Sequence, residues 1–218
     1  MNDPRSPYPL RRALGALAIA GVLAGALGAC GGSDDEPVDT PRTAADGSEF
    51  NDADVQFATR MIPHHAQAVE MAVLAEGRDL DPEVEALVAG IREAQVPEVQ
   101  TMTGWLTSWG EPVPETGLDH ANADEGDGAH DMDDMDDMQG TDDMVGMMSA
   151  EEMQELRTAG DAEFEQMWLE MMTEHHQGAV EMAEQEVEAG LYPDAIALAE
   201  SVITSQSAEI EAMEELLG

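Results

Sequence analysis

The sequence predicts an all-α protein, a four-helix bundle made of two repeated helical hairpins that a long disordered crossover joins. Its first support is an internal repeat, because residues 54–106 align without a gap to residues 165–217 and 16 of the 53 positions are identical. Apolar residues in each copy recur at spacings of three and four, the period of a helix. A short loop within each copy predicts an antiparallel helical hairpin. The duplication further predicts an internal pseudo-twofold axis.

Residues 1–29 resemble a bacterial lipoprotein signal peptide. Two arginines at positions 11 and 12 precede an apolar run, and small residues precede Cys30, the only cysteine. We expect cleavage before Cys30, which would carry the lipid and anchor an exported protein to the outer face of the cytoplasmic membrane. The alternative is an uncleaved membrane anchor, for which a run of about 17 apolar residues is short. A single cysteine allows no disulfide within the mature chain.

Residues 30–48 are rich in Gly, Ser, Asp, Pro and Thr and predict a flexible tether. The first helix is then expected over about 49–76, with Gly77 as its stop signal. Pro63 lies inside this helix and predicts a kink rather than a break, because the second copy has Glu174 at that position.

The first hairpin is expected to span residues 49–109. Its second helix should run from Pro82 to Trp109, because Asp81 is a good capping residue and proline suits the first helical position.

Residues 110–148 form an acidic, Met-rich stretch without helical or strand periodicity, which predicts a disordered crossover. Its Met-x-x-Met spacings, with Asp between and His nearby, are typical of a flexible site for soft cations such as Cu(I) and Ag(I). The alternative is acidic low complexity with incidental methionines. The candidate residues of this segment are His120, His130, Met132, Met135, Met138, Met144, Met147 and Met148.

The second hairpin is expected to span residues 149–218. Ser149 and Glu152 fit a capping box, so a third helix should run from there to about Ala189. The fourth helix is expected over 193–217.

Each copy carries an adjacent pair of histidines on the apolar stripe of its first helix. At 100° per residue, His64 and His65 share this stripe with Met61 and Asp54. The second copy places its equivalents in the same way, namely Glu165, Met172, His175 and His176.

The second helix of each copy turns two polar residues toward the core. Gln95 and Glu98 fall on the buried face in the first copy, and Gln206 and Glu209 repeat them in the second. A buried carboxylate is costly unless it is paired or bound to a cation, and the histidines of the facing helix are the available partners.

Imidazole and thioether together favour copper over calcium or magnesium. We therefore predict a metal site, with Glu and Gln orienting the ligands or binding a harder ion directly. The alternative is that His and Met are core residues, with each His hydrogen-bonded to a Glu. The candidate ligands are Met61, His64, His65, Met172, His175 and His176, and the supporting or alternative ligands are Asp54, Gln95, Glu98, Glu165, Gln206 and Glu209.

The formal net charge is −40, from 48 acidic residues against 8 arginines and no lysine. This balance argues against nucleic acid or an anionic membrane surface as a partner and favours cations. The alternative is that most of the charge forms solvated helix faces and an acidic linker.

The paired-histidine segments resemble the family called domain of unknown function 305. The motif Met61-Ile62-Pro63-His64-His65 followed by Ala68-Val69-Glu70-Met71-Ala72 is similar to that family, and residues 175–183 match it more closely. The resemblance implies a ferritin-like bundle, exported in bacteria, with some members linked to copper binding and tolerance. This chain departs from the pattern at Trp168 and Glu174.

Three functions are compatible with these patterns. The first is a lipid-anchored copper- or silver-binding protein that acts as a buffer, a chaperone or a tolerance factor. The second is a metal-free structural or partner-binding bundle in which His–Glu pairs fix helix register. The third, a di-iron oxidase, requires inward-facing Glu-x-x-His motifs, and neither histidine pair has a Glu three residues before it. Metal identity, ion number, oligomeric state and protein partners stay open at this point.

Overall fold

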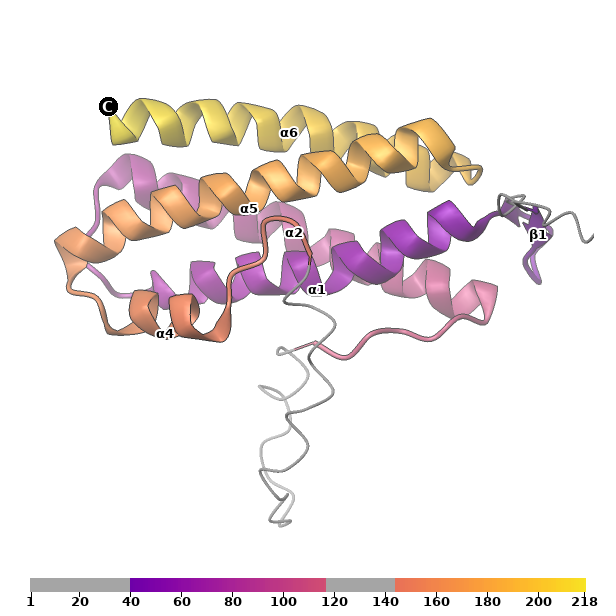
Figure 1. Ribbon diagram of the computed structural model, residues 1–218, viewed down its shortest axis with the longest axis horizontal. Coiled ribbons are helices and arrows are strands. Elements are labelled where there is room, and N and C mark those ends of the chain that lie inside the picture. The colour runs from indigo at the N-terminus through magenta and orange to yellow at the C-terminus, as the bar shows by residue number, and fades with distance from the viewer. Residues whose placement is uncertain (1–39, 117–143) are drawn as a thin grey trace, which may run out of the picture. The chain divides into compact units, whose positions relative to one another are not determined.

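The computed structural model describes residues 40–116 and 144–218, and there the chain is helical apart from one two-stranded sheet. Two long helical hairpins make up the fold, as Figure 1 shows. The first hairpin consists of α1 (Asp52–Leu74) and α2 (Pro82–Trp109), and the second of α5 (Asp161–Ala189) and α6 (Pro193–Leu217). The predicted all-α class is confirmed. None of the described helices is both long and apolar enough to cross a membrane.

The helix ends follow the capping signals of the sequence. Asn51 and Asp54 form a reciprocal capping box at the start of α1. Asp81 accepts the backbone N–H of Glu83 at the start of α2, and Gly110 ends α2 in the left-handed conformation at φ 76°. α1 continues through Pro63 without a break.

The predicted third helix is wrong as a single element. The chain forms α4 (Ala150–Thr158), leaves the helix at Ala159 and Gly160, and resumes as α5. The Arg78 guanidinium donates hydrogen bonds to the backbone carbonyls of Arg157 and Ala159, and its Cζ lies 3.8 Å from the centroid of the Phe164 ring. In a continuous helix these carbonyls would accept backbone N–H groups of the same helix. Here they accept hydrogen bonds from Arg78, which lies in the turn between α1 and α2.

The tether prediction is wrong for its last residues. β1 (Arg42–Thr43) pairs antiparallel with β2 (Glu49–Phe50), and the Phe50 ring stacks on Trp109 with centroids 4.7 Å apart. The apolar contact outweighs the polar composition of residues 40–48, because one buried aromatic ring is enough to hold a short hairpin against α2.

The disordered-crossover prediction is wrong at its C-terminal end. Residues 144–148 lie against the bundle, where Met144 is 9% exposed and Met148 is 5% exposed. The predicted signal peptide, Cys30 and the first part of the tether lie outside the described residues, as do His120, His130, Met132, Met135 and Met138.

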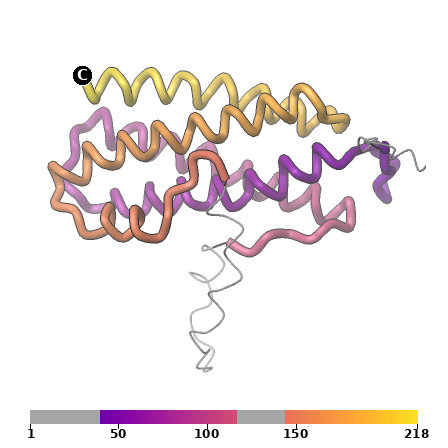
Figure 2. Tube along the Cα trace, in the orientation of Figure 1, coloured from indigo at the N-terminus to yellow at the C-terminus, as the bar shows by residue number. Residues whose placement is uncertain are grey.

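Two apolar clusters form the core. One contains Phe57, Met61 and Ala179, and the other contains Ala68 and Met172. Along α1 the histidine pair falls between Met61 of the first cluster and Ala68 of the second. Along α5 the order is reversed, because α1 and α5 pack side by side and run in opposite directions (Figure 2). The histidines therefore lie at the junction of the two clusters, in the middle of the bundle.

Candidate metal centre

Four histidine side chains meet in the interior of the bundle. His64 and His65 on α1 and His175 and His176 on α5 each have 0% exposed surface. The rings of His64 and His175 face each other across the two helices, with centroids 3.8 Å apart. The helical spacing of the sequence predicts this inward orientation. The structure adds that the first histidine of each copy meets its counterpart.

The second histidine of each pair contacts a glutamate of its own hairpin. His65 Nε2 lies 2.8 Å from Glu98 Oε2, and His176 Nε2 lies 2.8 Å from Glu209 Oε2. The two glutamate side chains are 18% and 22% exposed, so each carboxylate reaches the boundary between core and solvent. These contacts fix the ring orientation and leave Nδ1 of each imidazole to face the interior.

Many polar atoms around this histidine cluster have no hydrogen-bond partner of normal geometry among the described residues. Buried polar atoms are bonded in the large majority of cases, so such a concentration marks a place where a further group can bind. Gln95 and Gln206 precede Glu98 and Glu209 by three residues, about one helix turn, and are each 2% exposed. The atoms are both ring nitrogens of His64 and of His175, Nδ1 of His65 and of His176, Oε1 and Nε2 of Gln95, and Oε1 of Gln206.

Burial keeps the central imidazoles neutral. Desolvation lowers the pKa of His64 to about 3, with a further contribution from neighbouring His65, while the Val145 backbone carbonyl acts in the opposite direction. Desolvation also holds the pKa of His175 well below its ordinary value, and the nearby His64 adds to this effect. A neutral imidazole has a free lone pair, which is the form that binds a metal ion.

Two thioethers adjoin the histidines along the helices. Met61 precedes His64 by three residues and Met172 precedes His175 by three, which places each sulfur on the same helix face as its histidine pair. Both methionines are 0% exposed. Within residues 40–116 and 144–218, no group of three or more His, Cys, Asp or Glu side chains stands ready to hold an ion.

Asp54 and Glu165, the remaining candidate ligands, are used elsewhere. The Asp54 carboxylate accepts the backbone N–H groups of Asn51, Leu191 and Tyr192, and so connects the start of α1 to the start of α6. Glu165 accepts the backbone N–H of Asp81 at the start of α2. Each carboxylate thus links one hairpin to the other and lies away from the histidines.

The contribution of residues 144–148 could not be seen in their sequence pattern. The Gln67 amide holds both backbone groups of Met148, and the backbone of Val145 and Gly146 packs directly on Gly178 of α5. The sequence feature that relates to this contact is that Gln67 and Gly178 align in the internal repeat but are different residue types.

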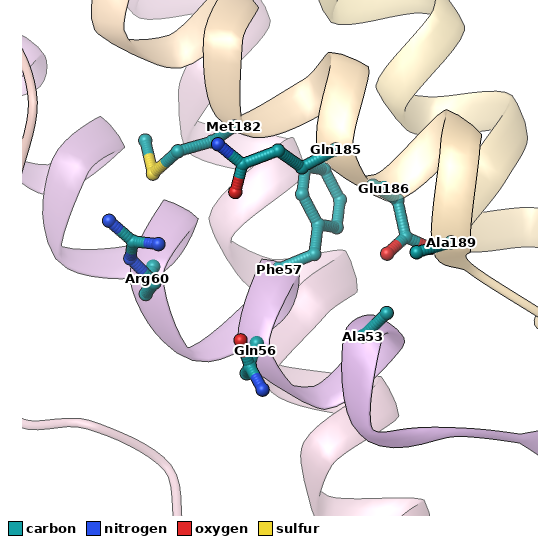
Figure 3. Close-up of a pocket in the computed structure, with 8 residues that line it drawn as sticks. All are labelled: Ala53, Gln56, Phe57, Arg60, Met182, Gln185, Glu186 and Ala189. Carbon is teal, nitrogen blue, oxygen red and sulfur yellow. The ribbon is translucent and has the colours of Figure 1, made fainter. Parts of the chain in front are cut away.

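One cavity of about 160 Å³ opens between α1 and α5, away from this centre. Figure 3 shows Phe57, Arg60 and Met182 among its lining side chains. No histidine is among the described residues that line it. The cavity is therefore not the metal centre.

Together, the fold and the centre define a duplicated helical bundle with buried, paired histidines in its interior. The profile of the family "Domain of unknown function (DUF305)" matches residues 54–217. The chain belongs to this family. The family resemblance drawn from the histidine motifs is confirmed.

Two solved DUF305 structures and those of CopM are similar to this chain. A DUF305 protein from Streptomyces coelicolor, described as secreted, is 34% identical, with 76% of this chain and 91% of that chain covered and a TM-score of 0.61. A DUF305 fragment from Deinococcus radiodurans is 29% identical, with 81% and 99% covered and a TM-score of 0.60. CopM in its Cu(II)-bound form is 29% identical, with 75% and 95% covered and a TM-score of 0.57. CopM has also been solved in Cu(I)- and Ag-bound forms. Among curated proteins, none matches the chain.

Proposed function

We propose that this protein binds copper, or silver, outside the cytoplasm and acts in buffering, chaperoning or tolerance of that metal, anchored to the membrane by a lipid on Cys30. The ion would bind at the histidine centre, with imidazole nitrogens of His64 and His175 and thioether sulfur of Met61 and Met172 as donors. Glu98 and Glu209 would orient the second histidine of each pair.

The observation that carries the proposal is that the ring nitrogens of His64 and His175 have no hydrogen-bond partner of normal geometry among the described residues. Both rings are fully buried, they face each other, and neutral imidazoles so placed have lone pairs without a partner. Nitrogen and sulfur donors in an interior of this kind suit a soft ion, while hard ions require oxygen.

The relatives support a metal of this kind. CopM, whose fold this chain shares at 29% identity, has structures with Cu(II), Cu(I) and Ag. The formal charge of −40 adds a long-range attraction for cations. The secreted relative and the sequence of residues 1–30 support an extracytoplasmic location.

A metal-free structural bundle is the second candidate, and one observation favours it. His65–Glu98 and His176–Glu209 are complete hydrogen-bonded pairs without an ion, and such pairs can fix helix register on their own. This candidate leaves the central pair, His64 and His175, without a role.

The test uses the full chain in detergent, titrated with Ag(I) and separately with Cu(I) under reducing conditions. Ion stoichiometry comes from mass spectrometry, and stabilisation from thermal unfolding. Binding to the folded state at about 100 times Kd should stabilise it by about 2.7 kcal/mol. The metal-free candidate predicts no tight ion and no thermal shift.

Single variants locate the ion. His64→Ala and His175→Ala should each remove the same bound ion, because the two rings meet at one place. Two independent sites would instead leave half of the metal bound in each single variant. Residual weak binding after loss of all four buried histidines would be assigned to the Met-rich residues 132–148. Tight binding that survives in that fourfold variant rules out the histidine centre.

A further inference from the structure

A short backbone segment crosses the histidine centre from outside the four long helices. We call residues 144–148 the strap, the stretch that forms the loop before α4 and rises toward α5 in Figure 1. The Val145 carbonyl lies against Gly178 of α5, since a Cβ there would clash with it, and the Val145 backbone raises the pKa of His64 although no hydrogen bond of normal geometry joins the two residues. Gly146 lies on the turn of α5 that carries His175, since a Cβ there would be 3.0 Å from the His175 carbonyl oxygen. The strap therefore touches the backbone or ring of both central histidine positions.

Two residues hold the strap, and they come from the same position of the internal repeat. Gln67 on α1 donates from Nε2 to the Met148 carbonyl at 2.8 Å and accepts the Met148 N–H at 2.7 Å. Gly178 on α5, 111 residues later, provides the space for the other end. A Cβ on Gly178 would lie 2.7 Å from the Val145 carbonyl carbon and 2.9 Å from Gly146 Cα.

This repeat position departs from the symmetry that the histidines keep. Residues 64–72 and 175–183 are identical at seven of nine aligned positions, and the two that differ are Ala66 with Gln177 and Gln67 with Gly178. The chain has only one strap, so the two copies of the repeat contact it through different residues. In the first copy Gln67 hydrogen-bonds to the strap, and in the second copy Gly178 has no side chain that would clash with it.

We propose that Gln67 and Gly178 are positioning residues that clamp the strap over the histidine centre and thereby control entry of a soft monovalent ion to His64 and His175. The inference rests on the proposed function for the identity of the ion, but the clamp itself is independent of it. With the strap in place, all four histidines have no exposed surface. Entry and release then require the strap to open, so the clamp sets the rates of binding and dissociation.

The first experiment measures access without any metal. Full-length protein in detergent is treated with diethyl pyrocarbonate, which modifies neutral imidazoles, and labelling of His64 and His175 is followed by mass spectrometry. Gly178→Ala should label at least about tenfold faster than the parent chain, because the added methyl displaces the strap and shifts an opening equilibrium by that factor or more. Equal labelling of the variant and the parent overturns the proposal.

A matched control separates the strap from general effects of alanine in a helix. Gly90 also lies inside a long helix, α2, and a Cβ there meets nothing within 4 Å. Gly90→Ala should leave labelling unchanged and slightly favour the helix. Faster labelling in both variants would mean that local fraying, not the strap, admits the reagent, and the proposal would fall.

A second variant acts on the other end of the strap, in case Gly178→Ala does not fold. Gln67→Leu keeps the side-chain size and removes both hydrogen bonds to Met148, while Gln67→Glu keeps only the acceptor for the Met148 N–H. Labelling should increase in the order parent, Gln67→Glu, Gln67→Leu. Gln100→Leu, on an exposed position of α2, is the control and should match the parent. No increase in Gln67→Leu contradicts the clamp.

The last measurement distinguishes the clamp from the proposed function. Stopped-flow mixing with Ag(I) should show association and dissociation both faster by about tenfold in Gln67→Leu, with Kd changed far less than either rate, because an opening step enters both. Faster labelling without Ag(I) binding in any chain keeps the clamp and removes the proposed function. Tight Ag(I) binding with unchanged rates and unchanged labelling keeps the proposed function and removes the clamp.

Discussion

Asp54 should contribute more to stability than any other single carboxylate of the two hairpins, and Asp54→Ala tests this. The side chain is 0% exposed and accepts three backbone N–H groups, from Asn51 at 2.6 Å, Leu191 at 3.0 Å and Tyr192 at 2.9 Å. α6 has no side-chain cap of its own at Tyr192, so Asp54 supplies the negative group at its N-terminus.

The expected cost follows from the three donors that the variant leaves without a partner. Each buried unsatisfied N–H costs about 1–3 kcal/mol, and partial access of water to the loop reduces the sum, so we expect a loss of about 3–6 kcal/mol. In a chain of this size a change of 1 kcal/mol moves Tm by about 2–4 °C, which predicts a Tm lower by roughly 6–24 °C.

The repeat provides the matched control for this measurement. Glu165 occupies the equivalent position but accepts only the Asp81 N–H, in an exposed setting. Glu165→Ala should therefore cost about 0.5–1.5 kcal/mol in urea or thermal unfolding. Equal losses for the two variants, or a loss below about 1 kcal/mol for Asp54→Ala, would refute the reasoning. Neither variant should change the number of bound Ag(I) ions, because both carboxylates lie away from the histidines.

Three further outcomes are expected. Glu98→Gln should weaken Ag(I) binding by about 10–100-fold while leaving one ion per chain, because the carboxylate orients His65 without being needed as a donor; an unchanged Kd by competition titration contradicts this. Because the pKa of His64 falls from 6.5 to about 3 on folding, the unfolded chain takes up a proton that the folded chain excludes. The contribution of His64 to stability should therefore be full above pH 6.5 and fall by about 1.4 kcal/mol per pH unit as the pH drops toward 3, and His175, whose pKa is also lowered, should add a loss in the same direction; His64→Leu should reduce that slope without abolishing it in denaturant titrations. Arg78→Lys should cost about 2–3 kcal/mol in the same assay, since lysine cannot replace the guanidinium that bonds three carbonyls over a ring; a loss no larger than that of the exposed Arg92→Lys would show that the guanidinium geometry is unimportant.

The long helices and the inward direction of the histidines could be predicted because both follow from local rules. The bounds of α2 and α6 match their Pro and Gly signals. The positions of Glu98 and Glu209 on their helix faces predict the contacts that they make with His65 and His176. A helix period fixes the direction of every side chain once the start is known. Pairing of His64 with His175 was beyond such rules, because it depends on the contact between the two copies.

The missed features all depend on contacts between segments distant in sequence. The break at Gly160 depends on Arg78, about 80 positions earlier, and the ordered end of the crossover depends on Gln67. The small hairpin at residues 42–50 depends on Trp109. Composition describes what a segment would do alone, so it fails where a partner elsewhere in the chain supplies the missing hydrogen bonds or apolar surface.

Identical and divergent positions of the repeat therefore carry different information. Positions kept in both copies, such as His65 with Glu98 and His176 with Glu209, are those whose contacts are repeated within each hairpin. Positions that differ between the copies and are still engaged, such as Gln67 and Gly178, are those that contact something present only once. The strap is single, so a symmetric pair of residues could not hold it: two glutamines would leave no room at Val145, and two glycines would leave Met148 without its bonds. At Gln67 and Gly178 the difference between the two copies thus coincides with contacts to a segment that the chain has only once.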